Sequence, residues 1–425
     1  MVLAATSIYF GPLLEPWQRL AVGAAGLLYL VKTIVLLTRL SQKEIKEFSP
    51  IGILIYMSIW PGIDPMPWRA RTKPEEDGRR FVRGLICLLI GLTGGLILSV
   101  SLPAMSTDAV GWLGIAVLIT CVHFGYAEML TTLVRLCGWD AGPLFDAPFR
   151  SASLNDFWSK RWNLAFVEMD RILFLPFLKA RFNIAIAVFL IFVLSGVLHE
   201  IALSYPPMAG WGLPLTYFLI QAIAVAIERK FFSRPDHWLK RLWTWLVLFV
   251  PLPLIFHAPF RESLIVPLFA WTHRLISRHD LQWYLNIALY LAAIGNFCTL
   301  GAGLQAPKVL KWEEDLAKMS RFNHKIFKNY AVYTGGMIIS WGILTLAIHD
   351  ELLRGDRAAI CISVVIGVFW LARILVDFFY FGSEDWPQGP QFVIGHACLT
   401  TLFLCMTVVY FGVVVIHSFK LLPAS

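Results

Sequence analysis

The strongest constraint on the fold is a series of apolar blocks, each about 20 residues long, that recur along the 425-residue chain. An α-helix of that length spans the ~30 Å hydrocarbon core of a bilayer and satisfies its own backbone hydrogen bonds there. Hydrophobic residues make up 58% of the sequence and charged residues only 15%, whereas soluble domains are roughly half apolar and a quarter charged. The sequence therefore predicts an all-α polytopic transmembrane helical bundle.

Ten segments have the length and composition of membrane spans. They are residues 20–39, 82–103, 110–134, 182–204, 211–229, 241–258, 281–303, 330–349, 358–380 and 391–417. Three further apolar stretches, near 4–14, 48–61 and 263–276, are too short to cross a bilayer comfortably. We expect them to form interfacial or re-entrant helices.

The net charge of +8 lies in short loops between alternate predicted spans. By the positive-inside rule these loops face the cytoplasm and the N-terminus starts outside. A secondary attraction of the loops to anionic lipid or to an anionic acyl carrier is also expected. Because the charge is spread in this way, we do not expect a nucleic-acid partner. No basic region precedes the first apolar stretch, so we expect no cleavable signal peptide. The chain is predicted to be a multi-pass protein of the bacterial inner membrane or the endoplasmic reticulum.

The seven cysteines form no C-x-x-C pair and lie mostly in apolar runs. This pattern indicates neither a zinc site nor a disulfide framework, and no other metal-ligand spacing is visible. A polar stretch at 272–280 divides the chain. We interpret residues 1–280 as one membrane domain and 281–425 as a C-terminal helical membrane block with no assignable role.

Two polar segments stand out in the first domain. Asn155–Asn163 reads Asn-Asp-Phe-Trp-Ser-Lys-Arg-Trp-Asn, and Ser195–Glu200 ends an apolar run with the pair His199-Glu200. A histidine at bilayer depth costs free energy unless it is paired, solvated or used in chemistry. These two segments therefore carry most of the functional information in the sequence.

Asn155–Asn163 resembles the "DFWxRRWN" signature, and Ser195–Glu200 the "SGLxHE" segment, of the membrane-bound O-acyltransferases, in their wax-synthase branch. Two weaker likenesses have the expected order: Tyr217–Arg229, similar to a following "FFLLQG…ER" helix, and Trp60–Asp64, similar to an upstream "WPG" element. The resemblance covers about residues 45–265.

Two departures, Lys160 for the family's Arg and Ser159 for its frequent Gly, remove no catalytic group. The resemblance implies an MBOAT-like catalytic domain that transfers a fatty acyl group from acyl-CoA to the hydroxyl of a lipophilic acceptor. The first expected acceptor is a long-chain alcohol, which would give a wax ester. Diacylglycerol and a sterol are the other expected acceptors.

The resemblance also implies roles for individual residues. His199 is expected to be the catalytic base and Asn163 its polar partner, which orients a substrate carbonyl or hydroxyl. The predicted substrate-binding residues are Asp156, Trp158, Arg161, Trp162 and Glu200. Acyl-CoA is a co-substrate, and no other cofactor and no metal is expected. The partners are then acyl-CoA, a lipophilic alcohol and membrane lipid.

The chemistry itself favours a histidine. Acyl transfer to a hydroxyl needs a base for the alcohol proton, and the unperturbed pKa of imidazole, ~6.5, lies near working pH. The sequence contains no G-x-S-x-G element, which argues against a covalent route through a serine nucleophile. If residues 182–204 form one helix, His199 lies roughly 25 Å from its cytoplasmic start. The acyl donor then needs a tunnel to reach the ring.

Each role has a structural alternative. His199 could be a packed histidine, Asn163 a helix cap or loop residue, and Glu200 a structural group or the partner of a basic residue. The remaining residues, Asp156, Trp158, Arg161 and Trp162, could anchor the segment at the membrane interface.

His123 and Glu128 in one span could line the same cavity, but a structural role is favoured for both. Arg373 and Asp377, at i,i+4 spacing in another span, are best explained as a structural ion pair. A transporter or channel that uses these four groups as a polar relay is the alternative from another class. O-acetylation of a polysaccharide is the alternative within the family.

Overall fold

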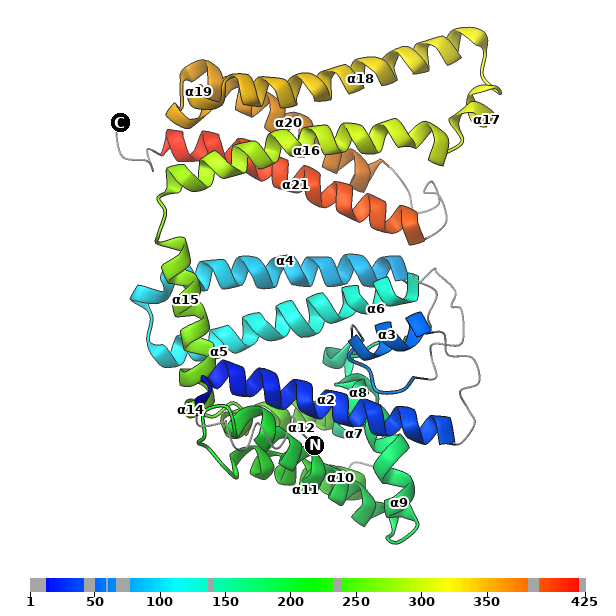
Figure 1. The fold of residues 1–425 in the computed structure, drawn as a ribbon, viewed down its shortest axis with the longest axis vertical. Helices are drawn as coiled ribbons and strands as arrows, with labels where there is room; N and C mark the ends of the chain where they lie inside the picture. Colours follow the sequence, from blue (N-terminus) through cyan, green and yellow to red (C-terminus); the bar gives the residue numbers. More distant parts are fainter. Residues whose placement is uncertain are drawn as a thin grey trace. The chain divides into compact units, whose positions relative to one another are not determined.

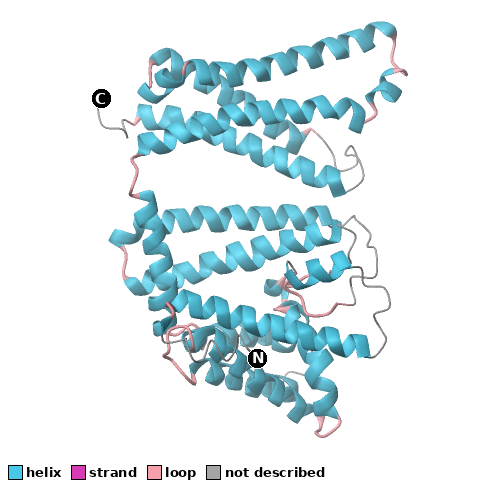
Figure 2. Cartoon of the chain, viewed as in Figure 1, coloured by secondary structure: helices cyan, strands magenta, loops and turns pink. Residues whose placement is uncertain are grey.

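The computed structural model describes residues 13–41, 50–58, 60–65, 77–136, 141–231, 238–380 and 390–419. Across these residues the secondary structure is helical, with connecting loops and no strand (Figures 1 and 2). The chain divides into two compact units, Met1–Arg274 and Leu275–Ser425. The prediction of an all-α polytopic bundle is confirmed.

Within the described ranges, nine helical segments are long and apolar enough to cross a membrane. They are Pro16–Ser41, Arg80–Ala104, Thr107–Arg135, Ile184–Ser204, Trp238–Ile255, Leu281–Val309, Arg321–Ala347, Arg357–Asp377 and Ile394–Ser418. They correspond to nine of the ten predicted spans. The remaining prediction, 211–229, is a helix, α11 (Leu213–Phe231). It does not qualify as a span by composition, because Glu228, Arg229 and Lys230 lie near its end.

The first unit begins with α2 (Pro16–Ser41), the short α3 (Pro50–Ser58) and α4 (Asp77–Ser101). The next span is α5 (Thr107–Leu118), which continues through a π-helical stretch, η5 (Ile119–Tyr126), into α6 (Ala127–Leu136). Helix α4 packs along both η5 and α6. Of the predicted short helices, 48–61 contains α3, whereas nearly all of 4–14 lies outside the described residues.

A series of broken helices follows in the first unit. They are the 3₁₀ turn η6 (Pro148–Arg150), α7 (Leu154–Asp156), η7 (Phe157–Arg161), α8 (Leu164–Met169), η8 (Asp170–Phe174) and α9 (Leu175–Lys179). Further helical elements then complete the unit. These are α10 (Ile184–His199) with η9 (Glu200–Ser204), α11, α12 (Trp238–Phe249), α13 (Leu252–Ile255), α14 (Ala258–Phe260), η10 (Arg261–Ile265) and α15 (Val266–Ile276). Helices α10 and α11 pack against each other. The predicted short helix at 263–276 thus corresponds to the end of η10 and α15.

The second unit is a helical block of its own. It comprises α16 (Leu281–Val309), α17 (Trp312–Leu316), α18 (Arg321–Ala347), α19 (His349–Arg354), α20 (Arg357–Phe379) and α21 (Pro390–Ser418). Helix α16 packs against α18, and α20 against α21. In its core the Tyr410 hydroxyl accepts a hydrogen bond from Asn296 and lies 2.6 Å from the Thr345 hydroxyl. The ion pair predicted between Arg373 and Asp377 is present.

Close helix packing in the first unit depends on small residues. A Cβ on Gly91 of α4 would lie 2.5 Å from the Cβ of Cys121 in η5. A Cβ on Gly125 would lie 2.7 Å from the backbone of Leu88. Because apolar side chains gain little by leaving lipid for another helix, such close backbone contact is a main source of association between membrane helices. The two glycines therefore let α4 and η5 approach.

We predict that Gly91→Val lowers stability by about 1–3 kcal/mol, because its side chain overlaps Cys121 unless the helices separate. The thermal unfolding midpoint in detergent measures the effect. Gly301→Ala is the matched control, since a Cβ there meets nothing within 4 Å. Equal midpoints for Gly91→Val and the wild-type protein would show that the helix contact is not tight.

Candidate active site

His199 is the last residue of α10, and one hydrogen bond fixes its tautomer. Its Nδ1 lies 2.7 Å from the backbone carbonyl oxygen of Ser195, one helical turn earlier. A carbonyl oxygen only accepts, so Nδ1 carries the proton and donates it. In the neutral ring Nε2 is then unprotonated. The ring is held in the form that a general base requires.

The surroundings of His199 are aromatic. Its ring centroid lies 4.4 Å from that of Phe218 and 5.6 Å from that of Phe166. Directly after His199 the helix widens into the π-helical η9. Isolated π-helical stretches are frequent at functional sites, since the extra residue changes which side chains face a cavity.

Two pockets meet at His199. The first has a volume of about 210 Å³, and its walls run along α10 from Ile184 to His199. The second has a volume of about 420 Å³ and lies against α2 and η5. Asn163, Phe166 and His199 line both pockets. A group bound in either pocket therefore meets the same histidine.

Asn163 starts a helix and also lines both pockets. Its φ is +46°, in the left-handed region that asparagine adopts more readily than most residues. Its carbonyl oxygen accepts the N–H groups of Phe166 and Val167, which starts α8. Its side-chain amide has no hydrogen bond within the described part of the chain. The amide is thus available to a ligand where the two pockets join.

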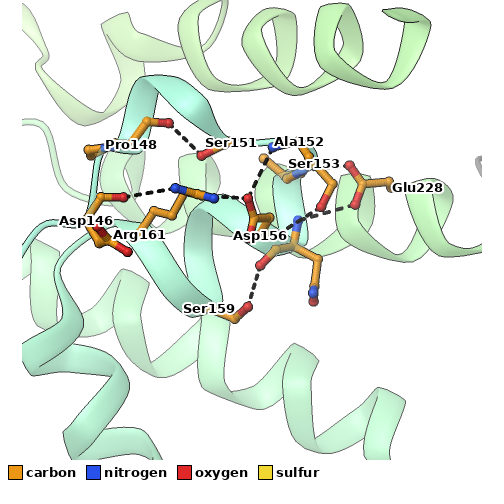
Figure 3. A network of polar contacts seen from close by, with 11 residues as sticks. Asp146, Pro148, Ser151, Ala152, Ser153, Asp156, Ser159, Arg161 and Glu228 are labelled. Carbon is orange, nitrogen blue, oxygen red and sulfur yellow. Dashed lines mark hydrogen bonds and ion pairs between the residues drawn. The ribbon is translucent and has the colours of Figure 1, made fainter. Parts of the chain in front are cut away.

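The segment before Asn163 is folded by an ion pair (Figure 3). Arg161 Nε donates to Asp156 Oδ2 at 2.6 Å, and the Ala152 N–H donates to the same oxygen at 3.2 Å. Arg161 also exchanges two hydrogen bonds with the backbone of Asp146. Burial favours protonation of Asp156, but the bonds from Arg161 and Ala152 outweigh it and hold the pKa of Asp156 below its usual value. Neither Asp156 nor Arg161 lines either pocket.

Two side chains of α11, to which the sequence had assigned no role, hold this segment in place. The Glu228 carboxylate accepts the N–H groups of Leu154 (2.7 Å) and Asn155 (3.3 Å) (Figure 3). Trp158 Nε1 donates to Gln221 Oε1 at 3.2 Å. Gln221 and Glu228 lie in the segment that resembles the "FFLLQG…ER" helix. That resemblance is the sequence feature that could have identified them. The two segments that resemble the family motifs, Asn155–Asn163 and Tyr217–Arg229, thus pack against each other in the structure.

Glu200, predicted to bind substrate, forms hydrogen bonds with the backbone at the start of α11. Its Oε1 accepts the N–H groups of Gly212 and Leu215, each at 3.0 Å. These donors lie at the start of α11, where backbone N–H groups lack helical partners and an acidic side chain is favourable. Glu200 does not line either pocket. Of the other predicted residues, Trp158 and Trp162 line the first pocket.

The "WPG"-like loop forms part of the second pocket. The buried Lys32 Nζ donates to the carbonyl oxygens of Tyr56 and Trp60. Glu168 accepts the N–H groups of Ile63 (2.9 Å) and Asp64 (3.0 Å). Burial raises the pKa of Glu168 despite these donors. Held at both ends, the loop places Pro61 and Ile63 in the pocket wall.

Three residues that line the first pocket, Asp170, Arg171 and Arg229, were not predicted. His123, for which a structural role was favoured over a place in a cavity wall, lines the second pocket. The sequence grouped His123 with Glu128, but the Glu128 carboxylate pairs with Arg80 at 3.4 Å and Arg83 at 3.2 Å. Nothing in the spacing alone separates a histidine that faces a pocket from one that is packed.

We predict that Glu228→Ala destabilises the protein by about 1–3 kcal/mol, because the N–H groups of Leu154 and Asn155 lose their acceptor in a buried site. The thermal unfolding midpoint is the measurement. Glu262→Ala, which removes an exposed carboxylate from the same unit, is the control. If both variants unfold at the same temperature, the carboxylate does not hold the segment.

A pH dependence follows from Asp170. Burial raises its pKa from 3.8 to about 7. Between these values the unfolded chain has lost this proton and the folded chain has kept it, so stability falls as pH rises through that window. Asp170→Asn cannot ionise. We predict that its unfolding midpoint rises relative to that of the wild-type protein by roughly 2–4 °C between pH 4.5 and pH 8.

The control for this pH series is Asp146→Asn, which alters an exposed carboxyl in the same unit. Its midpoint should follow that of the wild-type protein at both pH values. A constant difference between Asp170→Asn and wild type at pH 4.5 and pH 8 would contradict the raised pKa.

Comparison with known proteins bears on the same segments. Residues 140–220 match the model of the membrane bound O-acyl transferase family. That range contains both Asn155–Asn163 and Ser195–Glu200. The resemblance inferred from the two segments is thereby confirmed over this part of the chain.

Individual proteins similar to this chain are also named as O-acyltransferases. The chain is 31% identical over 128 residues to the probable long-chain-alcohol O-fatty-acyltransferase 7 of Arabidopsis thaliana, which covers 26% of this chain and 38% of that protein. It is 27% identical over 124 residues to the long-chain-alcohol O-fatty-acyltransferase of Simmondsia chinensis, with 25% and 35% covered. It is 30% identical over 95 residues to the acyl-CoA–sterol O-acyltransferase 1 of Arabidopsis thaliana, with 20% and 27% covered. The chain thus spans well under two thirds of each of these relatives.

Proposed function

We propose that this multi-pass membrane protein is an O-acyltransferase that moves a fatty acyl group from acyl-CoA to a lipophilic alcohol, with wax esters as the first expected product. One observation carries the proposal. His199, whose Nδ1 donates a hydrogen bond to the Ser195 carbonyl oxygen, lies where two pockets meet. A two-substrate reaction needs such an arrangement.

The first pocket suits the acyl donor. Arg171 and Arg229 line it together with residues from the start of α10. Arg171 donates one hydrogen bond to the Ser159 carbonyl and Arg229 one to Asn155 Oδ1. Each guanidinium has five N–H donors, so further donors remain for the phosphates of coenzyme A. The acyl thioester would extend along α10 toward His199.

The second pocket suits a lipophilic acceptor. Its walls are mostly apolar, and at about 420 Å³ it is the larger of the two pockets that His199 lines. Val122 and Tyr126 in its wall are 46% and 54% exposed on a candidate membrane span. An alcohol dissolved in the bilayer would therefore enter from the side.

The proposed reaction proceeds without an acyl-enzyme. His199 Nε2 takes the proton of the alcohol as its oxygen attacks the thioester carbonyl carbon. The new C–O bond forms, the C–S bond breaks, and the thiolate of coenzyme A takes the proton back from the imidazolium. The Asn163 amide donates a hydrogen bond to the carbonyl oxygen as negative charge develops on it. Ester and free coenzyme A are the products.

We predict that His199→Ala lowers ester formation by about 10²–10⁴-fold, the usual contribution of a general base. Asn163→Gly should lower it by about 10²–10³-fold, as for loss of one oxyanion donor. Glycine is chosen because it keeps the positive φ while it removes the amide. The measurement is transfer from labelled palmitoyl-CoA to hexadecanol, diacylglycerol and a sterol by purified protein.

Two outcomes would contradict the proposal. One is the absence of ester with any acceptor, and the other is full activity of His199→Ala. Acetyl-CoA and a polysaccharide acceptor in the same panel test the alternative within the family.

The transporter alternative has weaker support. Glu128 pairs with Arg80 and Arg83, and Asp377 pairs with Arg373. Each of these carboxylates is thus engaged in a local ion pair, which does not favour a relay. Solute or ion flux through proteoliposomes, in the absence of acyl transfer, would support this alternative instead.

A further inference from the structure

The second pocket contains a polar side chain that the proposed reaction does not use. His123, in η5, lines this pocket together with His199 and Asn163, and it does not line the first pocket. The remaining wall is apolar except for Tyr126, which is 54% exposed. His123 is therefore the additional polar group in the pocket that suits the acceptor.

Aromatic contacts fix the orientation of His123. Its ring stacks on Trp162 at a centroid distance of 5.8 Å and an interplanar angle of 13°. It meets Phe145 edge-on at 5.0 Å, and Phe145 in turn packs edge-on against Trp162 at 5.1 Å. Trp162 directly precedes Asn163. The imidazole is thus held against the segment that carries the proposed oxyanion donor.

The hydrogen-bonding capacity of this ring is unused. Nδ1 of His123 is buried and has no hydrogen-bond partner among the described residues. A buried polar atom without a partner costs roughly 1–3 kcal/mol, so such groups are rare and usually have a reason. Glu128, the nearest acidic residue in the same span, is bound by Arg80 and Arg83. Because Nδ1 is enclosed by protein, a ligand in the second pocket would meet the ring at Nε2, which forms no hydrogen bond among the described residues and is not enclosed in this way.

We propose that His123 binds the hydroxyl oxygen of the acceptor alcohol and holds it toward His199. The inference rests on the proposed acyl transfer. A hydroxyl has one donor and two acceptor lone pairs. It would donate its proton to His199 Nε2, accept a hydrogen bond from a ring N–H of His123, and keep the second lone pair for attack on the thioester. His123 is thus a positioning residue for the acceptor alone.

The test separates the two substrates. His123→Phe keeps an aromatic ring against Trp162 but cannot form a hydrogen bond, whereas His123→Asn and His123→Gln retain a donor at two different reaches. We expect His123→Phe to raise KM for hexadecanol about three- to tenfold, the value of one neutral hydrogen bond. KM for palmitoyl-CoA should stay within about twofold, and one of the two amide variants should restore the KM for hexadecanol.

Leu133→Ala is the matched control, since Leu133 lies on the same continuous helix, is 41% exposed and lines neither pocket. It should leave both KM values unchanged. Equal changes in both KM values for His123→Phe, or no change in either, would overturn the assignment. A lowered unfolding midpoint in all three His123 variants, with both KM values raised together, would instead identify a packing role and also overturn it.

A binding experiment distinguishes failure of this inference from failure of the proposed reaction. Binding of radiolabelled hexadecanol is measured in the His199→Ala background, without acyl-CoA, with and without His123→Phe. Binding that weakens about three- to tenfold with His123→Phe supports the inference even if no ester ever forms. Binding that is absent, or that His123→Phe does not change, rejects it.

Discussion

The site depends on three carboxylates of the first unit that each accept two backbone N–H groups. Glu228 holds the start of α7, Glu200 holds the start of α11, and Glu168 holds the loop after Trp60. Away from water, every irregular stretch of backbone needs such partners, since an unpaired polar group costs several kcal/mol. The carboxylates therefore allow a chain of broken helices to surround His199.

The proposed role of His199 depends on its position as well as on its imidazole. Its bond to Ser195 sets the tautomer, and its place between two pockets would give it access to both proposed substrates. Four π-helical stretches contribute lining residues to these pockets, among them Trp158 in η7, Asp170 in η8 and His123 in η5. The irregular turns thus bring polar side chains into walls that regular helices would leave apolar.

Sequence likeness identified the site segments but could not divide their residues by role. Asn163, Trp158 and Trp162 line a pocket, whereas Asp156 and Arg161 pair with each other five residues apart. All five lie in one run of nine residues, Asn155–Asn163, so a motif that covers the whole run cannot tell which side chains face a pocket. The distinction comes from the direction in which each side chain points from the irregular segment 156–163, which is held against α11 through Gln221 and Glu228.

By itself the sequence determined that the chain is a helical membrane protein, because the length of apolar runs is set by bilayer thickness. It also indicated His199 and Asn163 as candidate site residues, since a histidine in an apolar run is costly and the segments that contain the two residues resemble a known family. Only the tertiary structure decided that Glu200 caps α11 and that His123 faces the second pocket with Nδ1 unpaired. The physical reason is that hydrogen-bond partners more than a few residues apart are chosen by packing, which no local pattern encodes.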